Sequence, residues 1–211
     1  MLKQRIFLLI ISLLLNSFGN ALAISTHLGA VIWTASGQGV GALLNVSLSS
    51  ALIIYGIAIL LINALLAHEF NWRRIIGNFL FMFPFSLLID HVAAGLEALH
   101  LGALPFAVRL GLNIVAVILI GIAVALYQQA NLIMHPNDDL MYTLRFKYSH
   151  GNATTGQLKA YVIPIALTII AFIFKGEWFG IGIGTLISLI LQGPIIDMAH
   201  RLLFKNKQLT A

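Results

Sequence analysis

The polar residues that could bind a solute gather in two linkers, each lying between two long apolar segments. The first linker runs from Ser25 to Ser47 and carries no Lys, Arg, Asp or Glu. It contains Trp33, Gln38 and Asn45. An amide without a hydrogen-bond partner in an apolar environment costs roughly 2–7 kcal/mol. These side chains could therefore line the path of a polar solute, or they could bond the irregular backbone of the linker itself.

The second linker follows about a hundred residues later, at the corresponding place between two apolar segments. Its candidate solute-binding residues are His135, Asn137 and Asp138, which could form a polar site for a cation or a small polar solute. Pro136 favours the start of a turn or helix at this point. The alternative interpretation is that Asp138 or Asp139 only caps that helix on a solvated cytoplasmic loop.

Two aspartates near the ends of apolar segments are candidates for ion coupling. Asp90 follows Gly77 by 13 residues, and Asp197 follows Gly184 by the same interval. Ionisable residues inside membrane segments often belong to ion or proton pathways. The structural alternative is an ion pair, because Asp197 precedes Arg201 by four residues, which is one helical turn.

Several kinds of catalytic chemistry find no support in the sequence. The chain has no cysteine, which excludes disulfides, thiolate catalysis and cysteine-ligated metals. There is no HExxH spacing, and the glycine run at 176–184 lacks the Lys-Ser or Lys-Thr of a phosphate loop. That run is typical of close helix packing instead. We therefore expect no enzyme activity, no cofactor and no metal site.

Composition points to the membrane as the environment that positions these residues. Of 211 residues, 60% are hydrophobic and only 9% are charged, whereas a soluble domain has roughly 25% charged residues. The mean hydropathy is +0.96. The apolar runs are continuous, near 20 residues long, and do not alternate, which predicts an all-α polytopic membrane protein. The net charge of +5 comes from residues that flank these runs, so we expect a lipid bilayer and no nucleic acid as partner.

Six spans are predicted, and the basic residues orient them. Ten of the twelve Lys and Arg residues fall on one side if the N-terminus is cytoplasmic; Arg109 and Lys175 are the exceptions. This bias predicts that both termini are cytoplasmic. The first span resembles a signal peptide, but part of it has a counterpart in the fourth span, so we expect it to be retained. The predicted spans are about 6–24, 48–67, 75–99, 104–127, 159–175 and 181–203.

The spans divide into two similar halves, 1–102 and 103–211, each with three spans and one linker. An odd number of spans in each copy makes the second copy enter the membrane from the opposite side. The sequence therefore predicts two inverted-topology three-helix repeats with broken or re-entrant linkers. Transporters built in this way place the solute site where the repeats meet.

Short motifs in both linkers and in the last span resemble a bacterial family. The matching pieces are Leu28-Gly29 with Trp33, then Pro136-Asn137-Asp138 with Leu140-Met141, and Gly182-Ile183-Gly184-Thr185 to Gly193-Pro194. Together they resemble the YczE/YyaS/YitT-type bacterial multi-pass membrane proteins over most of the chain. This chain departs from the pattern in the first linker, where Ile32 and Thr34 stand in place of a Pro and an Asp. The resemblance implies a polytopic fold in the bacterial cytoplasmic (inner) membrane, but no defined activity.

Two functions fit these features. The first is a transporter or permease for a small polar solute, bound between the two repeats. The second is a non-transporting accessory or scaffold subunit of an export, biosynthetic or regulatory complex. The second function would require a membrane partner protein, and either one is compatible with a homo-oligomer.

Overall fold

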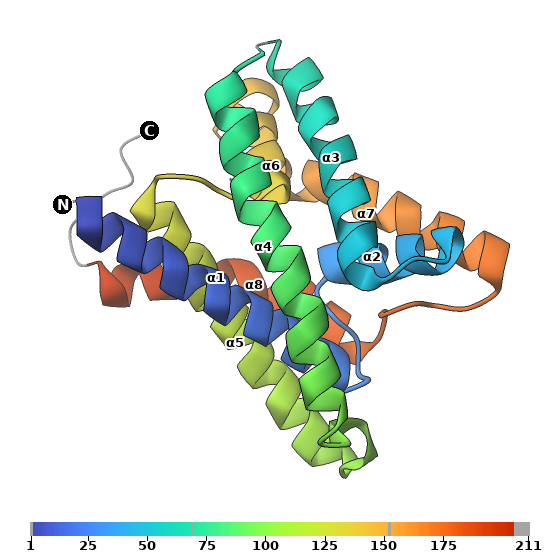
Figure 1. Cartoon of the computed structure of the whole chain (residues 1–211). Coiled ribbons are helices and arrows are strands. Elements are labelled where there is room, and N and C mark those ends of the chain that lie inside the picture. Colours follow the sequence, from blue (N-terminus) through green and yellow to red (C-terminus); the bar gives the residue numbers. More distant parts are fainter. Residues whose placement is uncertain (1, 69, 152, 205–211) are drawn as a thin grey trace. The chain divides into compact units, whose positions relative to one another are not determined.

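The computed structural model describes residues 2–68, 70–151 and 153–204, and the regular secondary structure of this part of the chain is helical, without strands (Figure 1). Six of its helices are long and apolar enough to cross a membrane. The prediction of an all-α polytopic membrane protein is confirmed. Of the basic residues that orient the spans, Lys205 and Lys207 lie outside the described residues. The helices are α1 (Leu2–Ser25), α2 (Ile32–Leu44), α3 (Leu48–Ala67), α4 (Trp72–Glu97), α5 (Phe106–Ala130), α6 (Pro136–Tyr148), α7 (Ala153–Lys175) and α8 (Ile183–Leu203), with a 3-10 turn at Leu101–Ala103.

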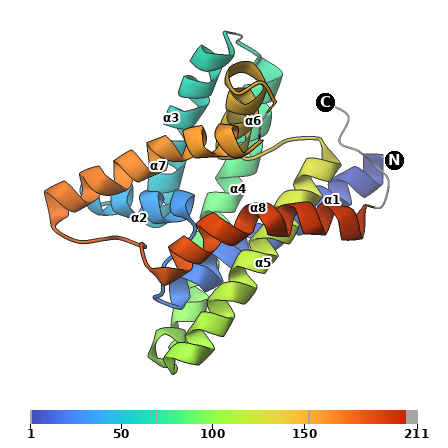
Figure 2. The same ribbon diagram turned by 180° about the vertical axis from the view of Figure 1, so that it is seen from behind.

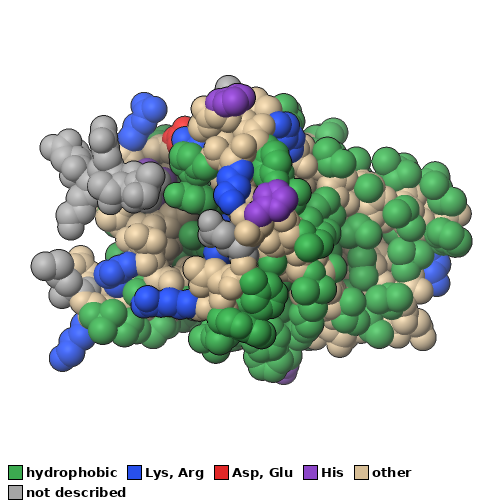
Figure 3. All heavy atoms as spheres, turned by 90° about the horizontal axis from the view of Figure 1, so that it is seen from above, with side chains coloured by type: hydrophobic (Ala, Val, Ile, Leu, Met, Phe, Trp, Pro, Cys, Tyr) green, Lys and Arg blue, Asp and Glu red, His purple; other side chains and the backbone are tan. Residues whose placement is uncertain are grey.

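Large apolar side chains are widely exposed along these helices. Figure 3 shows hydrophobic side chains covering much of one face, whereas Lys and Arg side chains gather mainly on the left of the view and also appear at its right edge. Leu65, Phe174 and Ile190 are each at least 70% exposed. Exposed apolar surface on this scale indicates contact with lipid, as expected of an integral membrane protein.

The fifth span is longer than the sequence predicts. The apolar run begins at Lys159, but α7 begins six residues earlier, at Ala153. Lys159 lies inside the helix and its Nζ donates to the carbonyl of Tyr148 at 2.6 Å. Polar residues end an apolar run without ending a helix, so hydropathy alone gave the wrong start.

Each linker contains a helix of 13 residues, although the sequence indicated broken or re-entrant linkers and suggested a helix start only at Pro136. α2 and α6 begin 104 residues apart in the sequence. His27 and Asn131 precede them, and Asn45 and His150 follow them, all four with positive φ. The left-handed region is uncommon for residues other than glycine, and here it marks the same turns before and after both short helices.

The chain forms two compact units, and each takes segments from both halves of the sequence. Unit 1 contains α1, α5, α8 and the end of α4. Unit 2 contains α2, α3, α6, α7 and the beginning of α4, within residues 32–87 and 133–180. Both predicted repeats, 1–102 and 103–211, therefore contribute to both units, and their boundaries stay a prediction.

In unit 1, α1 and α5 lie side by side in opposite directions (Figures 1 and 2). Arg5, near the start of α1, donates from Nε to the carbonyl of Ala130 at the end of α5, at 2.6 Å. The two helices approach closely at Gly19, where a Cβ atom would lie 2.8 Å from the side chain of Ile120. Small residues at such crossings are typical of membrane helix pairs.

In unit 2, each short helix packs on a long helix of the other sequence half: α2 on α7, and α6 on α3. Tyr55 and Ile59 of α3 share a buried cluster with Leu140 of α6. Further along, Lys147 of α6 donates to the carbonyl of Ala67 at the end of α3. α3 and α6 therefore run in the same direction, and the first turns of α6 lie beside the middle of α3, around Tyr55 and Ile59.

Candidate functional site

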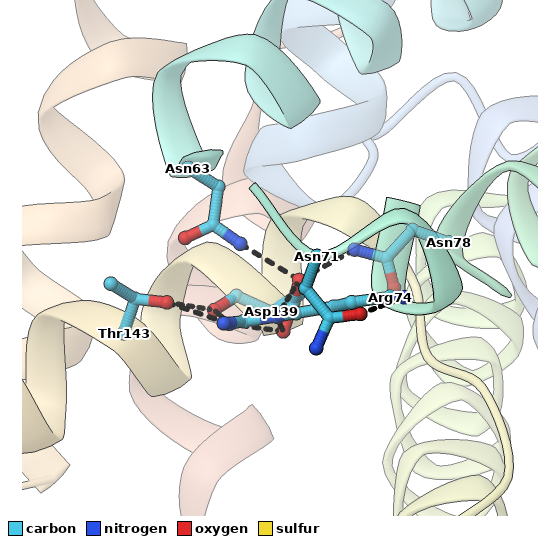
Figure 4. A network of polar contacts seen from close by, with 6 residues as sticks. All are labelled: Asn63, Asn71, Arg74, Asn78, Asp139 and Thr143. Carbon is cyan, nitrogen blue, oxygen red and sulfur yellow. Dashed lines mark hydrogen bonds and ion pairs between the residues drawn. The ribbon is translucent and has the colours of Figure 1, made fainter. Parts of the chain in front are cut away.

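A carboxylate lies at the centre of a polar network inside unit 2 (Figure 4). Asp139, in the first turns of α6, is only 3% exposed. Asn63 reaches it from the last turns of α3, and Arg74 and Asn78 reach it from the first turns of α4 (Figure 4). The network thus joins α3 and α4 of the first sequence half to α6 of the second half.

The carboxylate of Asp139 is held by one cation and two amides. Arg74 donates from Nε to both oxygens at 2.7 Å, and its Nη2 lies 2.6 Å from Oδ1. The Nδ2 atoms of Asn63 and Asn78 donate to Oδ2 at 2.7 and 2.5 Å. A buried charge is tolerated only when it is paired and hydrogen-bonded. Here the charge–charge contact and the two amides together supply that compensation.

The guanidinium of Arg74 lies over the carboxylate and closes it off. Its Nη2 also donates to the main-chain oxygen of Asp139 at 3.3 Å and to Oγ1 of Thr143 at 2.7 Å. The side chain of Arg74 is 32% exposed, whereas that of Asp139 is 4% exposed. Arg74 is therefore the member of the pair that solvent reaches first.

His135 fixes where α6 begins. Its Nδ1 accepts from the backbone N–H of Asn137 at 3.3 Å, which makes His135 the N-cap, with Pro136 as the first helical residue. The imidazole meets the rings of Phe81 and Phe85 edge to face. Although His135 is only half-buried by surface area, burial among these neighbours lowers its pKa to about 3. The neutral ring keeps a lone pair on Nδ1, which the cap requires.

The alternative in which an aspartate caps α6 on a solvated loop is wrong for Asp139. This residue is buried and its carboxylate binds other helices. Asp138 is half-buried and has polar contacts of its own. Asn137 is buried, and its Oδ1 has no hydrogen-bond partner among the described residues. The three predicted residues of the second linker thus lie together at the start of α6, next to Asp139.

Sequence reasoning missed Asn63, Arg74 and Asn78 as members of this network. Arg74 was interpreted only as a topology signal, because basic residues flank membrane spans. Asn63 and Asn78 are single amides within apolar segments. An amide in such a segment needs a partner, and that requirement is the signal that could have identified them.

Two of the first-linker residues line a groove in the same unit. Gln38 and Asn45 border a groove of about 470 Å³, together with Trp178, Phe179 and Gly180 of the segment after α7. The Oε1 atom of Gln38 is buried and has no hydrogen-bond partner among the described residues. Trp33 lies elsewhere, stacked on Tyr55 with ring centroids 5.9 Å apart. The structure therefore brings together Gln38 and Asn45, but not Trp33.

The groove and the Asp139 network border opposite ends of α3. Leu48 at the start of this helix lines the groove, and Asn63 near its end binds Asp139. Fifteen residues separate them, which is about 22 Å along a helix. At the network end the remaining void is about 10 Å³, room for roughly one water molecule. A groove thus lies beside the start of α3, whereas little space remains directly around Asp139.

Asp90 and Asp197 belong to unit 1, whereas Asp139 belongs to unit 2. Asp90 is half-buried in α4 and has polar contacts, and Asp197 is exposed on α8. Among the described residues, no group of three or more His, Asp or Glu side chains is placed to hold a metal ion. A coupling role for Asp90 and Asp197 stays a prediction.

The sequence motifs of the first linker and the last span meet in unit 1. The N–H of Gly184 donates to the carbonyl of Leu28 at 2.8 Å. Asn113 of α5, fully buried, donates from Nδ2 to Oγ1 of Thr26 at 3.0 Å and to the carbonyl of Gly29 at 2.9 Å. These motif residues therefore join α1, α5 and α8, which is a structural role.

Comparison with known proteins assigns a family. The model of a family described as "Family of unknown function (DUF6198)" matches residues 3–201, so the chain belongs to this family. No curated protein and no solved structure matches the chain significantly. The resemblance to YczE/YyaS/YitT-type proteins stays a prediction. Since the family description carries no activity, the function has to be argued from the site.

Proposed function

We propose that this DUF6198 protein is a permease for a small polar solute in the bacterial cytoplasmic membrane. The solute path follows α3, from the groove beside Gln38 and Asn45 to the network around Asp139. The observation that carries the proposal is the buried Arg74–Asp139 pair, whose partners come from both halves of the sequence.

The cost of this ion pair is the first argument. Replacing a buried ion pair by apolar side chains of similar volume is often neutral or stabilising. A charged pair is therefore a poor choice if the only need is to join α4 to α6. The Arg74–Asp139 pair fits a gate better than a structural cross-link.

The difference between the two ends of α3 is the second argument. The groove at one end is large enough for a metabolite, since ligand pockets span roughly 300–1,000 Å³. At the other end, the guanidinium of Arg74 covers Asp139 and leaves a void of about 10 Å³. Alternating access requires a solute path that is open at one end and closed at the other in any single state, and the unequal space at these two places is consistent with that requirement.

The helix arrangement is the third argument. α1 and α5 occupy corresponding places in the two predicted repeats, and they run in opposite directions. α2 with α7 and α6 with α3 are corresponding pairs that exchange partners across the halves. Inverted repeats would produce this arrangement, and in transporters built from them the solute site lies where the copies meet.

Uptake into proteoliposomes tests the proposal. The purified protein is reconstituted and tested against a panel of cationic, anionic, zwitterionic and neutral metabolites. We expect at least one solute to accumulate, with uptake lowered about tenfold or more in Asp139→Asn, which keeps the side-chain shape but removes the charge. Arg73→Gln, an exposed position on α4, is the matched control and should retain uptake.

Failure of every solute with well-folded protein would refute the permease. The accessory or scaffold function would then be the better explanation. If wild type and Asp139→Asn take up the solute equally, the protein is still a permease, but the Asp139 network has no part in transport. Size-exclusion chromatography in detergent and circular dichroism on each variant separate loss of function from loss of fold.

A further inference from the structure

We propose that the solute is a small organic cation with several N–H donors, a guanidinium or a primary ammonium, and that Arg74 occupies its place in the closed state. This inference rests on the proposed permease function and names its substrate class. Arg74 is then a tethered occupant of the site, and the solute replaces its guanidinium on Asp139.

The groups around the guanidinium of Arg74 are all hydrogen-bond acceptors. They are the two carboxylate oxygens of Asp139, the main-chain oxygen of the same residue and Oγ1 of Thr143. A planar cation with N–H groups in fixed directions matches such a set, and an ammonium matches part of it. An anion would meet the carboxylate and the carbonyl directly and would be repelled.

Asn63 adds an acceptor that Arg74 leaves unused. A carboxylate only accepts, so the contact between Nδ2 of Asn63 and Asp139 fixes the orientation of this amide. Its Oδ1 then points away from Asp139, as Figure 4 shows. Asn63 is 4% exposed and this oxygen has no hydrogen-bond partner among the described residues. A free cation with an additional N–H, or one water molecule brought with it, would satisfy Oδ1.

The position of Arg74 makes such an exchange feasible. It lies in the first turn of α4, and its side chain is one-third exposed. A long side chain in this place can swing into solvent without a change in the helix backbone. Its departure would leave Asp139 buried and uncompensated, a strongly unfavourable state. The pair therefore separates only when another cation takes over the carboxylate.

Removing the tethered cation gives a direct binding test that does not depend on transport. Calorimetry with methylguanidinium is compared on wild type, Arg74→Ala and Arg74→Ala/Asp139→Asn. We expect binding to Arg74→Ala at least about tenfold tighter than to wild type, and no binding to the double variant. Tetramethylammonium, which has no N–H, should not bind. Arg73→Ala, at the neighbouring exposed position, is the control and should behave as wild type.

Cysteine labelling provides the second test, with a readout at position 74 that does not depend on calorimetry, and circular dichroism checks the fold of each position-74 variant. The chain has no cysteine, so Arg74→Cys introduces a single thiol. We expect a cationic methanethiosulfonate (2-aminoethyl) to react faster than the anionic 2-sulfonatoethyl reagent, and methylguanidinium to slow the reaction. Arg73→Cys, the control, should show no such protection. If the anionic reagent reacts faster at position 74, or if methylguanidinium gives no protection, the proposal that a cation binds Asp139 in place of Arg74 is refuted.

The uptake panel separates this inference from the permease itself. Uptake of cationic solutes that methylguanidinium inhibits supports both proposals. Uptake restricted to anionic or neutral solutes would refute the organic cation as substrate, but it would still support the permease function. If no solute is taken up although methylguanidinium binds Arg74→Ala, the permease is refuted, and with it the assignment of a transported cation.

Discussion

Arg109 on α5 donates from Nη1 to the main-chain oxygen of Thr26, at the end of α1, at 3.3 Å. The contact has a counterpart, in which Arg5 on α1 donates to the main-chain oxygen of Ala130 at the end of α5. Arg5 and Arg109 are 104 positions apart, and so are Thr26 and Ala130. Each helix thus supplies the arginine that satisfies free carbonyls at the other helix's C-terminus, where cations are favourable.

The first prediction concerns these two arginines. Arg5→Gln and Arg109→Gln should each lower the free energy of unfolding by roughly 1–2 kcal/mol, because each removes a charge-assisted hydrogen bond to a helix end. The contacts lie at opposite ends of α1, so their effects should add in the double variant. Equilibrium unfolding in mixed micelles measures the change, with Arg73→Gln as the control. If the double variant loses a free energy of unfolding that differs strongly from the sum of the two single losses, the two contacts are not independent, which would contradict this arrangement.

The second prediction separates the effect of the Arg74–Asp139 pair on stability from its role in transport. Asp139→Leu leaves a partly buried guanidinium without its carboxylate and should cost roughly 3–5 kcal/mol. Replacing both members, Arg74→Met with Asp139→Leu, should restore most of that loss, because two apolar side chains need no compensation.

The double variant is then the sharper probe of function. It should be stable by micelle unfolding and inactive in uptake. A stable double variant that still transports would show that the ion pair serves only packing, and a double variant as unstable as Asp139→Leu would contradict the energetic argument.

The third prediction concerns pH and His135. Its pKa is about 3 in the folded protein and about 6.5 in an unfolded chain, so between these values the unfolded state binds more protons. Stability should therefore be independent of this group above pH 6.5 and should fall as the pH decreases toward 3. His135→Asn, which keeps a capping side chain, should reduce this slope. His150→Asn, at an exposed position, should leave it unchanged.

The fourth prediction concerns Gly29, which has φ +106°. A Cβ atom here would lie 2.6 Å from the backbone nitrogen of Gly182, in the contact that joins α1 to α8. Gly29→Ala should therefore destabilise unit 1 by roughly 1–3 kcal/mol. Gly95→Ala is the matched control, because no atom lies within 4 Å of its Cβ position; in a helix this change should stabilise by roughly 0.5–1 kcal/mol. Thermal unfolding of both variants checks this prediction, since the midpoint should fall for Gly29→Ala and rise for Gly95→Ala.

The sequence predicted the spans because the length of an apolar run is a local property that the bilayer thickness requires directly. α3 was predicted at 48–67 and begins and ends at those residues. Prediction failed at Lys159, where the helix continues through polar residues, and in the first linker, where a glycine-rich stretch gave no helical apolar face. In the second linker, the expected start of a turn or helix at Pro136 is confirmed, because α6 begins there.

By itself, the sequence determined that this is a polytopic helical membrane protein and that the residues around 135–139 are polar and adjacent. The tertiary structure alone decided which of them is buried and what it binds. Asp139 meets Asn63, Arg74 and Asn78 across 61 to 76 residues. Helical periodicity describes only neighbours within a few turns, so it cannot predict such pairs. The physical reason is that a buried charge requires partners, but the helix packing determines which residues supply them.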